Sequence, residues 1–288
     1  MPKSSGVGGD GQDLLDTRRY TDLETWAALR CPPGVVAADG PVDETAEGPA
    51  PDGSRAGQEA PADEAAFVLL LRGRIERGAF RRAAAAARAG RVYFPEDGPA
   101  GLWGRLAVVL DTPDDERPRV LAELREHARV VAASTAAPGT AALALELQAQ
   151  AMALEFLLQG GPLDAGAPVV EQWERAAAAY RDAGLGREAG RTTRRAARFV
   201  SEGYLRDHAR ARAMLRAEQA AAVAEGDDLR TAEARYALAE RALREWWGAP
   251  GGGGTPGRGA PGARVAGPGG VEGGGGCHAL GRTPPAPT

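Results

Sequence analysis

The chain has 288 residues and a formal net charge of −4, from 35 lysine and arginine residues against 39 aspartate and glutamate residues. This slightly acidic balance argues against a protein that binds nucleic acid through the overall charge of its surface. Hydrophobic residues make up 43% of the sequence but aromatic residues only 5%, and much of the apolar content is alanine. Because alanine buries little area, this composition favours closely packed helices over a sheet built from large apolar side chains.

Residues 1–62 are predicted to be an N-terminal tail that contains one helix. Residues 1–11 are rich in glycine, and residues 13–30 carry an apolar stripe that a Pro-Pro pair ends. Residues 32–62 are rich in proline, glycine, alanine and acidic residues, a composition that cannot bury enough apolar area to offset the entropy of ordering. We therefore predict an acidic, disordered linker over this last stretch.

Residues 63–247 are predicted to form a domain made only of helices, because valine and isoleucine never gather in the alternating runs typical of strands. Glycine and proline separate the expected helices. These helices cover residues 64–77, 79–91, 99–111, 116–135, 139–159, 168–183, 186–202, 205–225 and 228–246. Thr112 is the expected N-cap of the helix at 116–135, and Pro118 is expected in its first turn.

The remaining residues, 248–288, are largely glycine, proline and alanine and are predicted to be disordered. Two interpretations stay open for them, a linker to a further region and out-of-frame translation of GC-rich DNA. The same GC-rich bias accounts for the absence of asparagine and for a single lysine, Lys3, and it leads us to expect a bacterial source.

Two stretches share a spacing of large and small residues that is typical of packed helix pairs. Phe67 and Ala83 are 16 residues apart, as are Trp173 and Ala189. With the aromatic residue at position 4 of a 34-residue unit and the alanine at position 20, this pattern resembles the tetratricopeptide repeat (TPR). A third, weaker unit contains Ala220 and follows the second at a longer period, so the HEAT-like period also stays open.

The TPR resemblance implies an all-α fold, an α-α superhelix of antiparallel helix hairpins in which the first helix of each unit lines a concave face. The family positions that usually meet a ligand correspond here to Ala65, Val68, Arg72, Ile75 and Glu76 in one unit and to Glu171, Glu174, Ala178, Arg181 and Asp182 in the other. The resemblance thus implies a mixed-charge groove for an extended or helical peptide, with Arg72, Glu76, Glu171, Glu174 and Arg181 as candidate partner-binding residues. An ordinary solvated helix face is the alternative for each of them.

Arginines gather along one side of the helix predicted at 186–202. They recur at spacings of three and four residues, at Arg187, Arg191, Arg194, Arg195 and Arg198, while small and apolar residues take the other side. Like charges at this spacing repel one another, so the stripe indicates a site for an acidic protein or for an anion such as phosphate, with Arg187, Arg191, Arg194 and Arg198 as candidates. Two alternatives stay open: a solvated face partly neutralised by neighbouring helices, and a face covered by the acidic linker.

No pattern in the sequence supports catalysis, a metal site or a cofactor. His127 and His208 are 81 residues apart and lack carboxylate or cysteine companions at ligand spacing, and Cys31 and Cys277 form no CxxC pair. The glycines at 6–11 match GxGxxG, but no strand precedes them. We therefore predict a chain that is not an enzyme and that carries no catalytic residue, metal ligand or cofactor.

The leading hypothesis is a protein-interaction scaffold or adaptor that binds another protein or peptide through a TPR-like superhelix, with an acidic partner as one option. One alternative is the helical sensor region of a larger bacterial signalling protein. A second is a nucleic-acid-associated regulator that uses the arginine-rich face. Since no secretory signal is recognisable and the longest apolar run, residues 65–71, is too short to cross a bilayer, a cytoplasmic location without a membrane partner is expected.

Overall fold

The computed structural model describes residues 8–36, 63–160, 166–202 and 205–248. All regular secondary structure in these ranges is helical, which confirms the all-α prediction for this part of the chain. The linker predicted to be disordered lies outside the described residues from position 37 onward, as does the predicted C-terminal tail from position 249.

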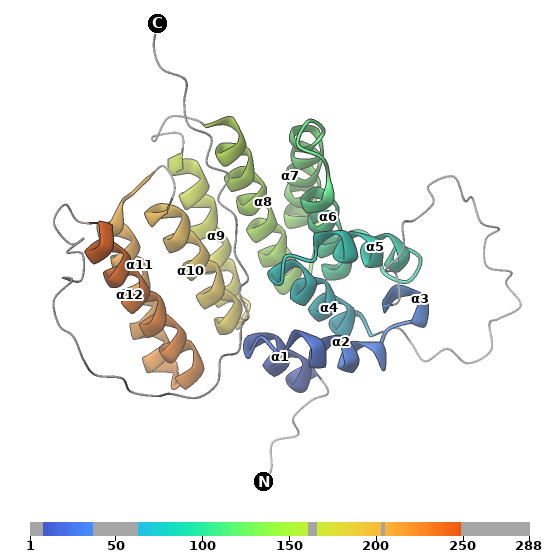
Figure 1. Cartoon of the computed structure of the whole chain (residues 1–288), viewed down its shortest axis with the longest axis horizontal. Helices are drawn as coiled ribbons and strands as arrows, with labels where there is room; N and C mark the ends of the chain where they lie inside the picture. The colour runs from blue at the N-terminus through green and yellow to red at the C-terminus, as the bar shows by residue number, and fades with distance from the viewer. Residues whose placement is uncertain (1–7, 37–62, 161–165, 203–204, 249–288) are drawn as a thin grey trace, which may run out of the picture. The chain divides into compact units, whose positions relative to one another are not determined.

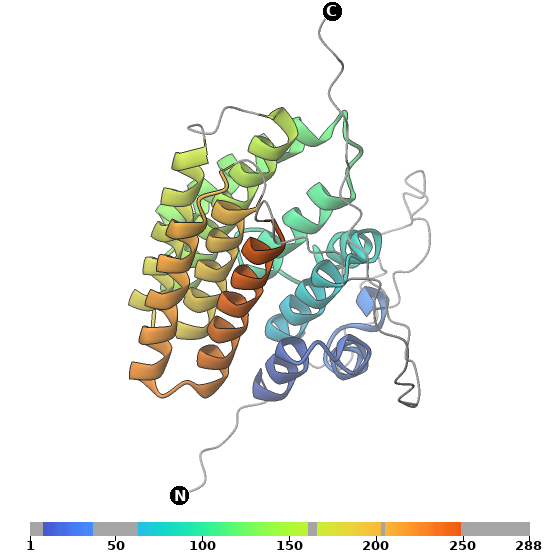
Figure 2. The ribbon, with the colours of Figure 1, turned by 60° about the vertical axis from the view of Figure 1, so that its left-hand side comes forward.

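The helices follow one another in chain order and pack mainly on their neighbours in sequence. They are α1 (Gly8–Asp16), α2 (Tyr20–Ala28), α3 (Pro33–Val36), α4 (Glu64–Glu76), α5 (Phe80–Gly90), α6 (Pro99–Asp111), α7 (Arg117–Ser134), α8 (Pro138–Gln159), α9 (Ala167–Asp182), α10 (Gly186–Ser201), α11 (His208–Glu225) and α12 (Asp228–Gly248). Figures 1 and 2 show α8 to α12 running side by side, with α1 and α2 against α4. From residue 64 onward, every predicted helix is present within a few residues of its expected bounds.

The N-terminal segment differs from its prediction. The single helix expected at 13–30 is instead two helices, α1 and α2, separated by a break in which Arg18 has a φ of 57°. The break allows Leu15 of α1 and Leu23 of α2 both to pack on Leu69 of α4. The burial of these three leucines outweighs the continuity of one helix.

Two further N-terminal predictions were wrong. The expected glycine-rich tail already becomes helical at Gly8, and α3 lies inside the stretch predicted to be a linker. Cys31 and Val35 are buried in the same core as α4 and α5, so the chain as far as Val36 is part of the packed structure. The composition did not indicate this short helix, because a few buried side chains are enough to order a short segment.

Three helix pairs are joined by the same turn. Gly78, Gly184 and Gly226 each have a left-handed backbone, with φ of 78°, 73° and 68°, between α4 and α5, α9 and α10, and α11 and α12. The residue after each glycine donates its N–H to the carbonyl five residues back, at 2.8, 2.8 and 3.0 Å. This is the Schellman arrangement, which closes a helix where only glycine adopts the backbone without strain.

Thr112 does not cap α7 as predicted. It follows the last residue of α6, and its hydroxyl donates to the carbonyl oxygen of Val108 at 2.7 Å. Residues 113–116 form a turn, and α7 begins only at Arg117, with Pro118 in its first turn as expected. The hydroxyl of Thr112 is therefore used to end one helix and is not available to begin the next.

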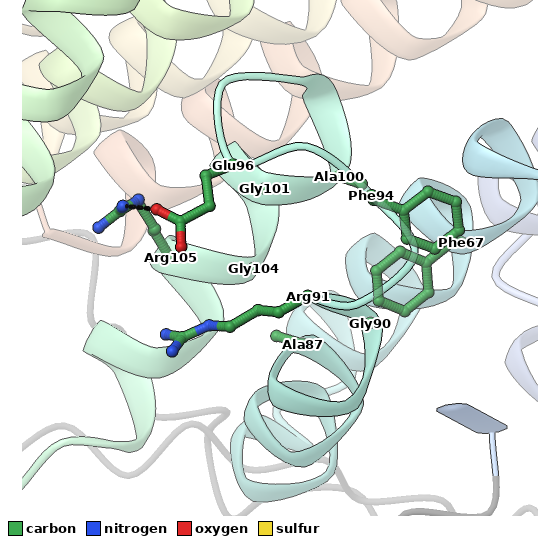
Figure 3. A pocket seen from close by; sticks show the side chains of 10 residues that line it. All are labelled: Phe67, Ala87, Gly90, Arg91, Phe94, Glu96, Ala100, Gly101, Gly104 and Arg105. Atoms are coloured by element: carbon green, nitrogen blue, oxygen red, sulfur yellow. Dashed lines mark hydrogen bonds and ion pairs between the residues drawn. The ribbon is translucent and has the colours of Figure 1, made fainter. Parts of the chain in front are cut away.

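Small residues bring α5 close to both α4 and α6. In α5, Ala83 to Ala87 and Gly90 are all buried, and a Cβ on Gly90 would lie 2.5 Å from the Phe67 ring. Phe67 stacks on Phe94, with 4.8 Å between ring centroids, as Figure 3 shows beside the glycines of α6. The cavity left there is only about 20 Å³, room for about one water molecule, so this is a packing interface and not a ligand site.

Among the residues that the structure describes, one helix is long and apolar enough to cross a membrane by length and composition. This is α8, with 22 residues and a mean hydropathy of 1.3 in its most apolar window. Half of that window is buried inside the structure, where α8 packs between α7 and α9. A core helix of a folded domain meets the same criterion, so the criterion does not decide whether α8 meets lipid.

We predict that Gly90→Ala destabilises the fold by about 1–3 kcal/mol, because the added methyl group enters the space of the Phe67 ring. Without this clash, alanine in place of a helical glycine would stabilise the helix. The double variant with Phe67→Leu should cost less than the sum of the two single variants, since the smaller side chain relieves the clash. Urea unfolding of the four proteins measures this, and strictly additive effects would contradict it.

We predict that Cys31 resists alkylation in the folded protein. It is buried in the core, and its burial raises the pKa of the thiol to about 11, so the reactive thiolate is scarce at neutral pH. In a Cys277→Ser background, iodoacetamide should label the chain only after guanidinium unfolding, as measured by intact mass. Fast labelling of the native protein would show that the segment around α3 does not pack on the core.

Candidate functional site

Four helices from distant parts of the sequence, α4, α6, α8 and α10, share one face, together with the end of α9. A pocket of about 290 Å³ lies in this face. Its lining consists of Val68 and Arg72, Pro99 and Trp103, Gly139, Thr140, Leu143 and Glu146, Tyr180 and Leu185, and Glu188, Arg191 and Arg195. We call this the inner pocket.

The inner pocket follows from the order of packing. Each helix from α7 to α11 packs on the next one along the chain, and α4 also contacts α6, which contacts α8. Alternate helices of such a stack lie on the same side. The side chains that line the pocket are therefore far apart in sequence, from Val68 to Arg195.

Glu146 is the central carboxylate of the inner pocket. It is 4% exposed and accepts hydrogen bonds from the Tyr180 hydroxyl at 2.6 Å and from Arg195 at 2.5 Å, one on each oxygen. Burial, reinforced by the charge of Glu146, raises the pKa of Tyr180 well above its usual range. The phenol therefore stays protonated, and both oxygens of Glu146 are occupied by donors within the fold.

Arg72, a predicted partner-binding residue, lies in the wall of the inner pocket. It is 7% exposed, its Nε has no hydrogen-bond partner, and no described carboxylate pairs with it. Its guanidinium carbon lies 5.6 Å from the centroid of the Trp103 ring, within the range of a cation–π contact. A buried guanidinium without a carboxylate is unusual, because burying a charge is costly unless the charge is paired.

Glu76, the second candidate in α4, lies one turn further along that helix. Its carboxylate is 3.8 Å from the Arg195 guanidinium. Burial raises the pKa of Glu76, and the neighbouring Arg195 and Arg72 act in the opposite direction. The structure thus brings two predicted residues of α4 together with the arginine-rich helix α10, a proximity that no sequence spacing indicates.

Each arginine of the predicted stripe on α10 lies within 4.0 Å of a carboxylate from the described residues. Arg187 lies 3.6 Å from Asp227, Arg191 2.8 Å from Asp16, Arg195 2.5 Å from Glu146 and Arg198 2.6 Å from Glu202, while Arg194 pairs with Glu233. The partners come from α1, α8 and α12 and from residues that flank α10 and α12. Much of this stripe is therefore neutralised by neighbouring helices, as one of the two alternatives expected. The other alternative, a cover formed by the acidic linker, concerns residues 39–62, which lie outside the described residues.

The three candidates on α9 do not line the inner pocket. Glu174 and Arg181 line a second cavity, of about 360 Å³, formed with α10 and α11, and Glu171 is exposed on the same helix. Glu174 pairs with Arg210 of α11 at 3.0 Å. The nine candidate residues thus do not form one surface. In chain order α5 to α8 lie between α4 and α9, and since alternate helices share a side, α4 and α9 lie on different sides. The role of the candidate residues toward a partner stays a prediction.

Trp103, Glu146 and Tyr180 were not among the predicted site residues. A signal existed for Glu146, the one charged residue in the otherwise apolar first half of α8. A single carboxylate among buried alanines and leucines requires a donor from another helix. Nothing in the sequence identifies Arg195 as that donor.

A buried ion pair links α11 and α12 beside α10. Arg230 and Glu218 are 2% and 1% exposed at their side chains, and their atoms approach to 3.0 Å. Arg230 also pairs with Glu225, which is half exposed. A Cβ on Gly190 of α10 would lie 2.2 Å from Glu218, so only glycine lets α10 approach this pair.

The described residues contain no group of three or more histidine, cysteine, aspartate or glutamate side chains that could hold a metal ion. His127 lies 3.3 Å from the carbonyl oxygen of Glu96 and 3.5 Å from Asp97, at the surface. Gly8, Gly9 and Gly11 of the GxGxxG match lie in α1, and the residues before Gly8 lie outside the described part of the chain. Comparison with protein-family models, curated proteins and solved structures finds no match for this chain.

We predict that Glu218→Gln lowers the free energy of unfolding by about 3 kcal/mol. The change leaves the Arg230 charge buried without its main partner, and the cost is at the low end for such pairs because Glu225 remains. The matched control is Glu174→Gln, which breaks an ion pair whose side chains are 41% and 48% exposed and should cost less than about 1 kcal/mol. Chemical denaturation measures both variants, and equal costs would show that burial of the pair is unimportant.

Proposed function

We propose that this chain is a non-catalytic interaction scaffold that binds a protein or peptide through a TPR-like superhelix of helix hairpins. In this proposal the binding surface is the face formed by α4, α6, α8 and α10. Of the two first helices that the family pattern implies, this face contains α4 but only the end of α9. The observation that carries the proposal is this shared face, hollowed by the inner pocket. Stacked helical repeats use such continuous faces to bind their partners.

Two features support a repeat architecture. The turns at Gly78, Gly184 and Gly226 are alike in backbone and hydrogen bonding. The anchor positions of the family pattern are buried in both units, with Phe67 at 1% and Trp173 at 4% exposure. In this interpretation α8 is an additional helix that lies between two repeat units. The extra helix shifts the alternation by one, so α10, and not α9, shares the face of the inner pocket with α4.

The two alternative functions gain less support. Nucleic-acid binding rests on the arginine stripe, and the carboxylates that pair with it reduce the positive field available to phosphates. The sensor interpretation depends on a further region of a larger protein. A cytoplasmic location without a membrane partner remains part of the proposal and fits α8 as a core helix.

The proposal predicts that a charge at the rim of the inner pocket abolishes partner capture. Leu185 lines the pocket and is 37% exposed, so Leu185→Glu should alter the surface with little effect on the core. The matched control is Val223→Glu on α11, another exposed apolar residue that lies outside this face. The full chain and both variants are immobilised, and proteins retained from a bacterial extract are quantified by mass spectrometry.

The expected result is a protein retained by the wild type and by Val223→Glu and lost with Leu185→Glu. Equal retention by all three would place the binding surface elsewhere. Retention of nucleic acid alone, lost at higher salt, would favour the regulator alternative. Circular dichroism of each variant verifies that helicity is preserved.

A further inference from the structure

We propose that the inner pocket is a binding site for a carboxylate carried on a small apolar or aromatic body. The group that would bind the carboxylate is the guanidinium of Arg72. This inference goes beyond the binding of a protein partner proposed above. It concerns a small ligand that the isolated chain binds, and it holds whether or not a protein partner exists.

The first step of the argument is the charge of the pocket. Three arginines, Arg72, Arg191 and Arg195, face two glutamates, Glu146 and Glu188, in its lining. Arg195 is paired with Glu146, and Arg191 is paired with Asp16 of α1. The lining itself thus carries three positive and two negative charges, and the carboxylate that pairs with Arg191 comes from outside the lining.

The second step is the state of Arg72. Among the arginines of the pocket it alone lacks a carboxylate partner within the described residues, and its buried Nε makes no hydrogen bond. Both oxygens of Glu146 already accept hydrogen bonds, and Glu76 pairs with Arg195 instead. A buried cation in this state is costly to the fold and becomes favourable when an anion enters.

The third step is the shape and polarity of the rest of the wall. Val68, Pro99, Trp103, Leu143 and Leu185 present apolar surface beside the guanidinium. The volume of about 290 Å³ is at the lower end of the range for small-molecule pockets. A planar guanidinium binds a carboxylate through two parallel hydrogen bonds, and an apolar body would displace water from the indole of Trp103.

The expected ligand is therefore a monocarboxylate and not a phosphate or a dicarboxylate. A second negative charge would meet Glu146 and Glu188 at the same site. The same chemistry can come from a free organic acid or from a carboxylate of a peptide, and the measurement separates these sources.

Isothermal titration calorimetry of the full chain tests the proposal. The probes are 3-phenylpropanoate and its neutral amide, and a tripeptide ending in phenylalanine with a free or an amidated carboxyl group. The acid should bind saturably and the amide at least tenfold more weakly. Binding of the free-carboxylate peptide at similar or higher affinity would assign the site to peptide ligands, and binding of phenylpropanoate alone would assign it to free acids.

Arg72→Met is the decisive variant. It should weaken acid binding by about tenfold to a hundredfold, the loss expected for a hydrogen bond to a charged group. Because Arg72 has no carboxylate partner, the same change should leave the thermal midpoint of the ligand-free protein unchanged or higher. The control Arg235→Met removes an exposed arginine of α12 and should alter neither measurement.

Any of four results would overturn the proposal. The first two are equal affinity for acid and amide, and no binding of any acid. The others are undiminished acid binding by Arg72→Met and a large fall in the thermal midpoint of that variant, which would give the arginine a structural role. The capture experiment with Leu185→Glu is scored on a protein partner, so its failure is distinguishable from any of these.

Discussion

Close approach of helices at alanine and glycine is the constraint on which the rest of this structure depends. The five buried alanines of α5 lie at tight helix contacts, and an added Cβ would meet the Phe67 ring at Gly90, Ala87 at Gly104 and Glu218 at Gly190. With few aromatic residues available, the area buried in the core comes from many small contacts and not from a few large ones. Adding a single methyl group at such a position therefore disturbs two helices at once.

The same closeness explains why charged side chains are buried here. Helices that approach at small residues carry their long side chains to the edges of the contact, where arginine and glutamate from different helices meet. Arg230 with Glu218, and Arg195 with Glu146, are such pairs. Arginine is suited to this position because its apolar stem covers neighbouring side chains while its planar head pairs with a carboxylate. Arg72 departs from this scheme, and it does so in the wall of a pocket.

Much of the helical framework could be predicted because its signals are local. Glycine at Gly78, Gly184 and Gly226 ends a helix through its own backbone freedom, and Pro118 favours the first turn of one. The break between α1 and α2 could not be predicted, because it depends on Leu69 of a helix that is distant along the chain. Thr112 failed as a cap for a related reason, since its hydroxyl had two possible uses and the sequence does not rank them.

By itself, the sequence determined an all-helical fold for the part of the chain that the structure describes and the approximate bounds of its helices beyond residue 63. It also determined the identity of the small residues at their contacts and the predominance of arginine among its cations. The tertiary structure decided which charges are paired and which helices share a face. Helix periodicity specifies the side of a helix on which a residue lies but not the helix that packs there. Because α4, α6, α8 and α10 share the face that holds the inner pocket, Arg72 meets Trp103 and α10 and does not meet the candidates on α9.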